Sequence, residues 1–107
     1  VVVSVYPRFD FLLLGMNQLV NHLDKLEQFT NKQFHAKVII RVGIGATEPL
    51  YPGVQHCGDY TEAFKKILKN IGIFQLSGPG IIHDFYTMAY TWYHSVLVVE
   101  DMNLYNE

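Results

Sequence analysis

The sequence predicts an α/β fold, with a mostly parallel sheet of about four strands and helices packed on its faces. Short runs of aliphatic, largely β-branched residues alternate along the chain with segments of helical period. These runs are nearly continuous in apolar residues, as the strands of parallel sheets are. Half of the 107 residues are hydrophobic and 17% are charged, so the chain can bury one modest core.

The first two elements are a strand and a helix. Residues 1–6 are nearly all apolar and do not alternate, so we expect a strand covered on both faces. Apolar residues then recur at steps of three and four over residues 9–29, which predicts an amphipathic helix. Asp10 lies near its start, where a negative charge favours the helix dipole.

The middle of the chain predicts a strand, a long loop and a helix. Residues 36–42 read as a second buried strand. Residues 43–59 contain four Gly and two Pro and therefore predict a loop, which at this length is usually functional or mobile. Residues 61–70 predict a helix with Asp59 or Thr61 as alternative N-caps.

The last third predicts a strand, a helix and a strand. Residues 71–76 and 96–99 are the strands, and residues 81–92 carry the apolar stripe of the helix between them. Ligands of open parallel sheets tend to lie at the carboxyl ends of the strands. The segments expected there are residues 6–11, 43–59, 77–80 and the tail after residue 99.

Composition excludes several classes of partner. The net charge of −2 gives no reason to expect nucleic-acid binding. No apolar run approaches the roughly 20 residues of a membrane span. The single cysteine, Cys57, excludes an internal disulfide, and we expect a reduced, cytoplasmic protein. The chain opens inside an apolar run rather than at Met, so we expect it to come from the interior of a longer protein.

The loop over residues 43–59 contains most of the candidate chemistry. Gly43-Ile44-Gly45 follows a strand and favours either a phosphate-binding loop or a flexible turn, although it lacks the remaining residues of either phosphate motif. His56 is either a proton donor and acceptor near neutral pH or a solvated loop histidine. Cys57 follows it directly, and neighbours in sequence rarely form a base–nucleophile pair. The five histidines form no HExxH motif, so we predict no metal site.

Two aromatic residues lie where the first predicted helix begins. In Phe9-Asp10-Phe11, an aromatic ring at the carboxyl end of a strand can stack on a flat heterocycle. Packing in the core is the alternative, and it is the better explanation for Phe9.

Five segments together follow the pattern of a known family. They are Phe9-Asp10-Phe11, Asn17 to Lys25, Val38 to Arg41 with a glycine soon after, Gly53-Val54-Gln55-His56, and Val98 to Glu100 with Leu104-Tyr105. The pattern resembles the pyrimidine-binding domain of transketolase-like, thiamine-diphosphate-dependent enzymes. It is most similar to the β-subunit of 2-oxoacid (pyruvate or acetoin) dehydrogenase E1 components. The resemblance covers nearly all of residues 1–107 and indicates a partial domain.

The resemblance implies a cofactor, a reaction and two site residues. Phe11 matches the aromatic residue that stacks on the aminopyrimidine ring of thiamine diphosphate. His56 matches an active-site histidine that faces the substrate and assists proton transfer or binding of the acyl acceptor. The implied reaction is decarboxylation or cleavage of a 2-oxo compound, with acyl transfer to a lipoyl carrier.

The chain departs from the family in ways that bear on activity. The glutamate that protonates the pyrimidine lies upstream of the matched segment, and the Gly-Asp-Gly motif for diphosphate and magnesium belongs to another domain or subunit. We therefore expect the chain alone to be inactive, acting as a homo-oligomer or beside an E1 α-type partner subunit. The alternative is a stand-alone oligomeric binding or assembly module that kept the fold and lost catalysis.

Overall fold

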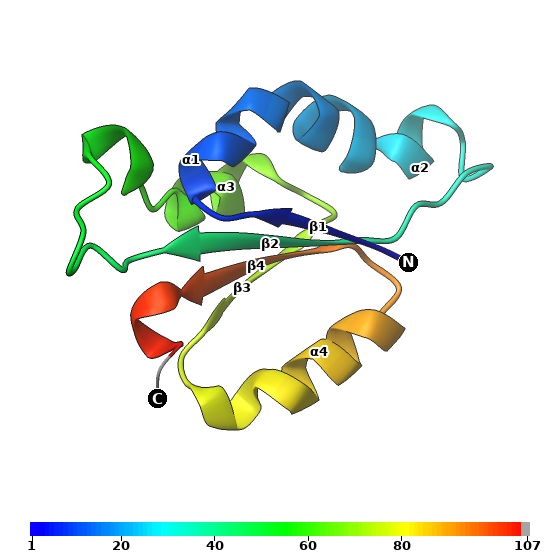
Figure 1. Cartoon of the computed structure of the whole chain (residues 1–107). Coiled ribbons are helices and arrows are strands. Elements are labelled where there is room, and N and C mark those ends of the chain that lie inside the picture. The colour runs from blue at the N-terminus through cyan, green and yellow to red at the C-terminus, as the bar shows by residue number, and fades with distance from the viewer. Residues whose placement is uncertain (106–107) are drawn as a thin grey trace.

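A computed structural model describes residues 1–105 and contains one four-stranded sheet (Figure 1). The strands are β1 (Val2–Tyr6), β2 (Val38–Ile44), β3 (Gly72–Leu76) and β4 (Val96–Asp101). All three strand pairs are parallel, and the order across the sheet is β1-β2-β4-β3. The predicted α/β class with a parallel sheet is confirmed.

The helix predicted over residues 9–29 is a helical run of changing winding. Its parts are α1 (Phe9–Leu12), a 3₁₀ turn (Leu13–Gly15), a π-helical stretch (Asn17–Leu23) and α2 (Leu26–Phe29). The prediction of one regular helix is therefore wrong. The spacing of apolar residues specifies which side of the helical run faces the core. It does not specify whether each N–H donates to the carbonyl three, four or five residues earlier, which distinguishes 3₁₀, α and π helices.

Two further helices complete the layers. α3 (Thr61–Ile67) is three residues shorter than the segment 61–70 predicted for it, and α4 (Ile82–Thr91) follows a 3₁₀ turn that begins at Pro79. Short 3₁₀ turns also occur at Val54–His56 and Met102–Leu104. Within the described residues, no helix combines the length and apolar character that a membrane span requires.

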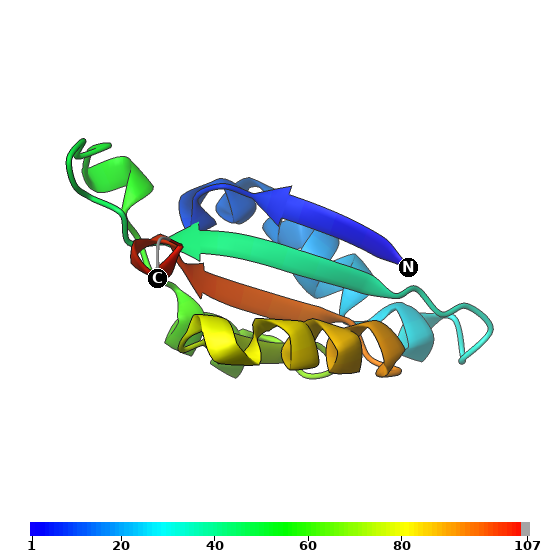
Figure 2. The same cartoon turned by 60° about the horizontal axis from the view of Figure 1, so that its bottom comes forward.

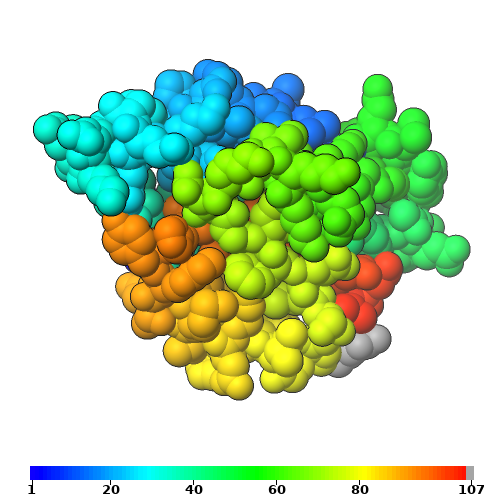
Figure 3. Space-filling view, turned by 180° about the vertical axis from the view of Figure 1, so that it is seen from behind, coloured from blue at the N-terminus to red at the C-terminus, as the bar shows by residue number. Residues whose placement is uncertain are grey.

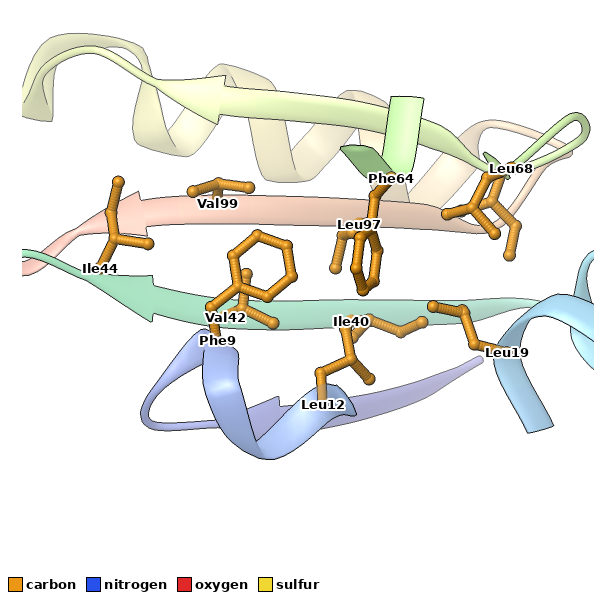
Figure 4. Packing of buried hydrophobic residues seen from close by; sticks show 11 residues of the cluster. Phe9, Leu12, Leu19, Ile40, Val42, Ile44, Phe64, Leu68, Leu97 and Val99 are labelled. Carbon is orange, nitrogen blue, oxygen red and sulfur yellow. The ribbon is translucent and has the colours of Figure 1, made fainter. Parts of the chain in front are cut away.

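The helices cover the two faces of the sheet unequally. The run from α1 to α2 lies with α3 on one face, and α4 lies on the other (Figure 1). On the first face, Phe9 and Phe64 pack edge to face with ring centroids 5.0 Å apart. Figure 4 shows the residues around them: Leu12, Leu19, Ile40, Val42, Ile44, Leu68, Leu97 and Val99. On the second face, Ala89 of α4 packs on Ile39, Leu76, Val96 and Val98.

β1 is an exposed edge strand. Val2, Val3 and Val5 are each 54–61% exposed, and β1 borders the sheet on the side away from α4 (Figure 2). The prediction that residues 1–6 are covered on both faces is therefore wrong. An unbroken apolar run shows that both sides of a strand are apolar, but it does not show what covers them.

Candidate functional site

The segments that follow β1 and β2 meet at the carboxyl-terminal edge of the sheet. The Arg8 guanidinium donates to the carbonyl oxygens of Gly45 and Ala46, with Nη2 3.1 Å from the Ala46 oxygen. The Ala46 N–H donates to Asn103 Oδ1 at 3.0 Å. The long loop after β2 is thus held at its base from two sides, and its outer part projects at one end of the molecule (Figure 3, green).

The two glycines at the base of this loop allow close backbone approach. A Cβ on Gly43 would collide with the carbonyl oxygen of Pro7, and a Cβ on Gly45 would collide with the carboxylate of Asp101. Gly45 also has a φ of +75°, which L side chains rarely adopt. Close packing against Pro7 and against Asp101 of β4 thus explains both glycines without a phosphate ligand.

Asp10 fixes the far end of the loop. Its carboxylate accepts hydrogen bonds from the Gly58 N–H at 3.2 Å and from the Tyr60 hydroxyl at 2.8 Å. The bond to Asp10 raises the pKa of Tyr60, because it favours the protonated phenol. Asp10 therefore joins the start of α1 to a segment about 50 residues further along the chain.

Phe11 and His56 lie next to each other at this edge. Their ring centroids are 5.4 Å apart, and the ring planes are inclined by 56°. Phe11 is 44% exposed, whereas Phe9 is fully buried against Tyr60 and Phe64. The prediction that Phe9 packs in the core is confirmed. Phe11 and His56, which the resemblance selects, are in contact, and the ring of Phe11 is partly exposed to solvent.

A local hydrogen bond selects the tautomer of His56. Its Nδ1 lies 3.2 Å from the carbonyl oxygen of Pro52. Because a carbonyl can only accept, Nδ1 carries a hydrogen, and in the neutral ring Nε2 is the basic nitrogen. The Cys57 thiol donates instead to the Gly53 carbonyl at 3.1 Å. His56 and Cys57 therefore make separate bonds and do not form a base–nucleophile pair.

An open groove adjoins the free ring of Phe11. It has a volume of about 700 Å³ and runs between β1 and the helical run, with Tyr6, Gly15 and Gln18 among its lining residues. The walls are mostly apolar, and the Gln18 amide and Tyr6 hydroxyl supply hydrogen-bonding groups. Such a surface suits a flat ring of modest polarity.

A buried carboxylate on the opposite face was not identified from the sequence. Glu100 accepts three hydrogen bonds from the Arg41 guanidinium, the shortest from Nη2 at 3.0 Å, and one from the Tyr86 hydroxyl at 2.6 Å. Tyr105 adds a hydroxyl at 3.1 Å. Arg41 gave part of the signal, because a charge inside a predicted apolar strand requires a partner. Glu100 follows the predicted strand 96–99 directly and lies inside β4 only in the structure.

Burial and these bonds shift the ionisation of the Glu100 network. The bond from Arg41 to Glu100 raises the pKa of Arg41. Burial, with the bond to Glu100, raises the pKa of Tyr86 and of Tyr105. All three shifts favour the protonated forms of Arg41, Tyr86 and Tyr105, which are the forms that donate to Glu100. The network therefore links β2, β4 and α4.

The described residues contain no group of three or more His, Cys, Asp or Glu side chains arranged to hold a metal ion. No family model matches the chain, and no curated protein matches it significantly.

Proposed function

We propose that this chain supplies the surface on which the aminopyrimidine ring of thiamine diphosphate rests in a transketolase-like enzyme of the 2-oxoacid dehydrogenase E1 type. The observation that carries the proposal is the contact between Phe11 and His56, whose ring centroids are 5.4 Å apart. The two residues are 45 positions apart in sequence, and the resemblance assigns both to one site.

The residues at the edge fit the ring of the cofactor. The free face of Phe11 offers an offset or edge contact to a flat heterocycle, and the groove beside it leaves room. The Nε2 of His56 can accept or donate a proton near the bound ring. When bound, the cofactor supplies a nucleophilic thiazolium carbon for cleavage of a 2-oxo compound.

Neither Asp10 nor Glu100 fits the activating role of the family's glutamate. Asp10 is engaged by Gly58 and Tyr60, and Glu100 is buried with Arg41 on the other face. The diphosphate and its magnesium would be bound by a partner domain or an E1 α-type subunit. The chain alone is therefore expected to show no turnover of 2-oxoacids with thiamine diphosphate and Mg²⁺, and clear turnover would contradict this expectation.

The proposal is tested with the aminopyrimidine alone, because this probe does not need the diphosphate site. We expect titration with 4-amino-2-methylpyrimidine to shift the NMR signals of the Phe11 and His56 rings, with saturation in the millimolar range. Phe11→Ala should abolish the shifts at His56. Tyr90→Ala removes an aromatic ring that is 62% exposed on α4, and it should leave them unchanged.

The outcomes separate the two functions. Saturable shifts at Phe11 and His56 that require Phe11 support the pyrimidine surface. Absence of shifts up to the solubility of the probe, or shifts that Phe11→Ala leaves intact, would overturn the proposal and favour the stand-alone module.

A further inference from the structure

We propose that β1 is a self-pairing edge through which two copies of this chain join as antiparallel β1 strands. The interface extends the sheet from four strands to eight. The inference uses Val2–Tyr6 and does not rest on the proposed function, because neither Phe11 nor His56 takes part.

The backbone of β1 offers free hydrogen-bonding groups to a partner strand. The Val2 N–H donates to the Lys37 carbonyl at 3.1 Å, toward β2. Because the backbone groups of a strand point alternately to its two sides, those of Val3 and Val5 point away from the sheet. β1 has neither Pro nor a charged residue, the usual devices that protect an edge from pairing.

The other edge strand is better protected. In β3, Phe74 packs edge to face against Phe85 of α4 and against Trp92, with ring centroids 5.3 Å and 5.8 Å apart. Gly72 and the exposed Gln75 interrupt its apolar character. Of the two edge strands, β1 is therefore the one better suited to pair with a strand of a second copy.

The side chains of β1 are apolar on the face that α4 occupies. Val3 pairs with Ile39, whose side chain packs in the core beneath α4, so Val3 and Val5 lie on that same face. Each of these valines is 54% exposed. On the opposite face, Leu14 is 87% exposed, close to the open groove that it lines with Ser4.

Twofold symmetry and full overlap of Val2–Tyr6 in the two copies together specify the pairing register. Antiparallel strands exchange hydrogen bonds between residues whose backbone groups point outward, so Val3 of one copy pairs with Val5 of the other. Ser4 then faces Ser4 of the second copy across the axis as a non-hydrogen-bonded pair, with Cα atoms about 4.5 Å apart. The four valines form a cross-strand cluster on the α4 face, a favourable arrangement for β-branched residues.

The area indicates a weak dimer. An apolar side chain of this size offers roughly 100 Å² when fully exposed. Val1, Val2, Val3, Val5 and Leu14 are each more than half exposed, so two copies present roughly 600 Å² of apolar surface in addition to the backbone. This lies below the standard interface of about 1,600 Å². We therefore expect a weak dimer whose fraction rises with the concentration of the chain.

Sedimentation velocity between 1 and 200 µM tests the dimer. The wild-type chain should shift from monomer to dimer across this range. The double variant Val3→Lys/Val5→Lys places like charges opposite each other in the proposed register, and it should weaken association at least tenfold. The double variant Leu50→Lys/Val54→Lys adds the same charge at loop positions that are 77% and 82% exposed, and it should associate as the wild type does.

Disulfide cross-linking tests the register without perturbing the fold. In a Cys57→Ser background, Ser4→Cys should form a covalent dimer rapidly under mild oxidation, because the paired Cα distance suits a disulfide. Val3→Cys should not, because Val3 lies opposite Val5 and two residues away from Val3 of the other copy. A monomer at every concentration would overturn the proposal. A dimer that tolerates Val3→Lys/Val5→Lys and cross-links no faster at residue 4 than at residue 3 would also overturn it.

Discussion

At the scale of single residues, three charged side chains determine how the carboxyl-terminal edge is assembled. Arg8 and Asp10 bind the two ends of the long loop, and Glu100 binds Arg41 and two tyrosines on the other face. The sequence placed Phe11 and His56 among the candidates but assigned Asp10 only to the helix dipole. Its bond to Gly58 spans 48 residues, a pairing that no local pattern encodes.

The Glu100 network leads to a prediction about stability. Glu100→Gln keeps the shape but replaces the acceptor of the Arg41 bonds with a neutral amide. We expect it to lower the free energy of unfolding by about 2 kcal/mol, since bonds to charged groups contribute about 1.5–3 kcal/mol and Arg41 is partly solvated. Urea denaturation at pH 7 measures the change.

The exposed pair formed by Glu62 and Lys65 is the matched control. Glu62 is in an i,i+3 ion pair on α3, and its side chain is 83% exposed. Glu62→Gln should change stability by less than about 0.5 kcal/mol. Equal effects of the two substitutions would show that the Glu100 network contributes no more than a surface pair does.

At the scale of elements, apolar runs predict the strands better than the helices. The residue range 96–99 was predicted as a strand, and β4 includes it, because four aliphatic residues in a row suit a buried parallel strand. The strand order could not be predicted, since it depends on which faces the connections cross. The exposure of β1 also could not be predicted, because it depends on what lies beside Val3 and Val5.

Asp24 connects two elements that the sequence does not link. It is 3% exposed, lies directly after the π-helical stretch, and accepts bonds from the N–H groups of Lys69, Asn70 and Ile71 ahead of β3. We expect Asp24→Ala to reduce the free energy of unfolding by about 3 kcal/mol, because it leaves three amides without their acceptor. Thermal unfolding with Asp84→Ala, at an exposed position in the first turn of α4, provides the comparison, and equal losses would contradict this role.

At the scale of the whole molecule, hydroxyl-to-carboxylate bonds connect distant segments and make stability sensitive to alkaline pH. Tyr60 donates to Asp10, Tyr93 to Glu27, and both Tyr86 and Tyr105 to Glu100. The pKa of each of these tyrosines is raised, by its carboxylate bond first for Tyr60 and Tyr93, and by burial first for Tyr86 and Tyr105.

The sign of the pH effect follows from these shifts. Above pH of about 10 the unfolded chain releases its tyrosine protons while the folded chain retains them, so stability falls as pH rises toward the raised pKa values. The lowered pKa of Lys37, caused by desolvation, acts in the opposite direction. Tyr86→Phe removes one phenol and leaves Lys37 in place, so it should flatten the loss of stability between pH 9 and 11.5. Parallel curves for Tyr86→Phe and the wild type, measured by urea denaturation, would contradict this assignment.

Arg8, Asp10 and Phe11 all follow β1 within five residues of its last residue, Tyr6. Only a short connection therefore separates this edge strand from the residues that hold the distant loop. If β1 shifted by one residue along β2, Arg8 and Asp10 would move away from their hydrogen-bond partners in and after the loop. The contact between the rings of Phe11 and His56 would also be lost. A strand from a second copy that pairs with β1 would therefore act directly on the positions of Arg8, Asp10 and Phe11.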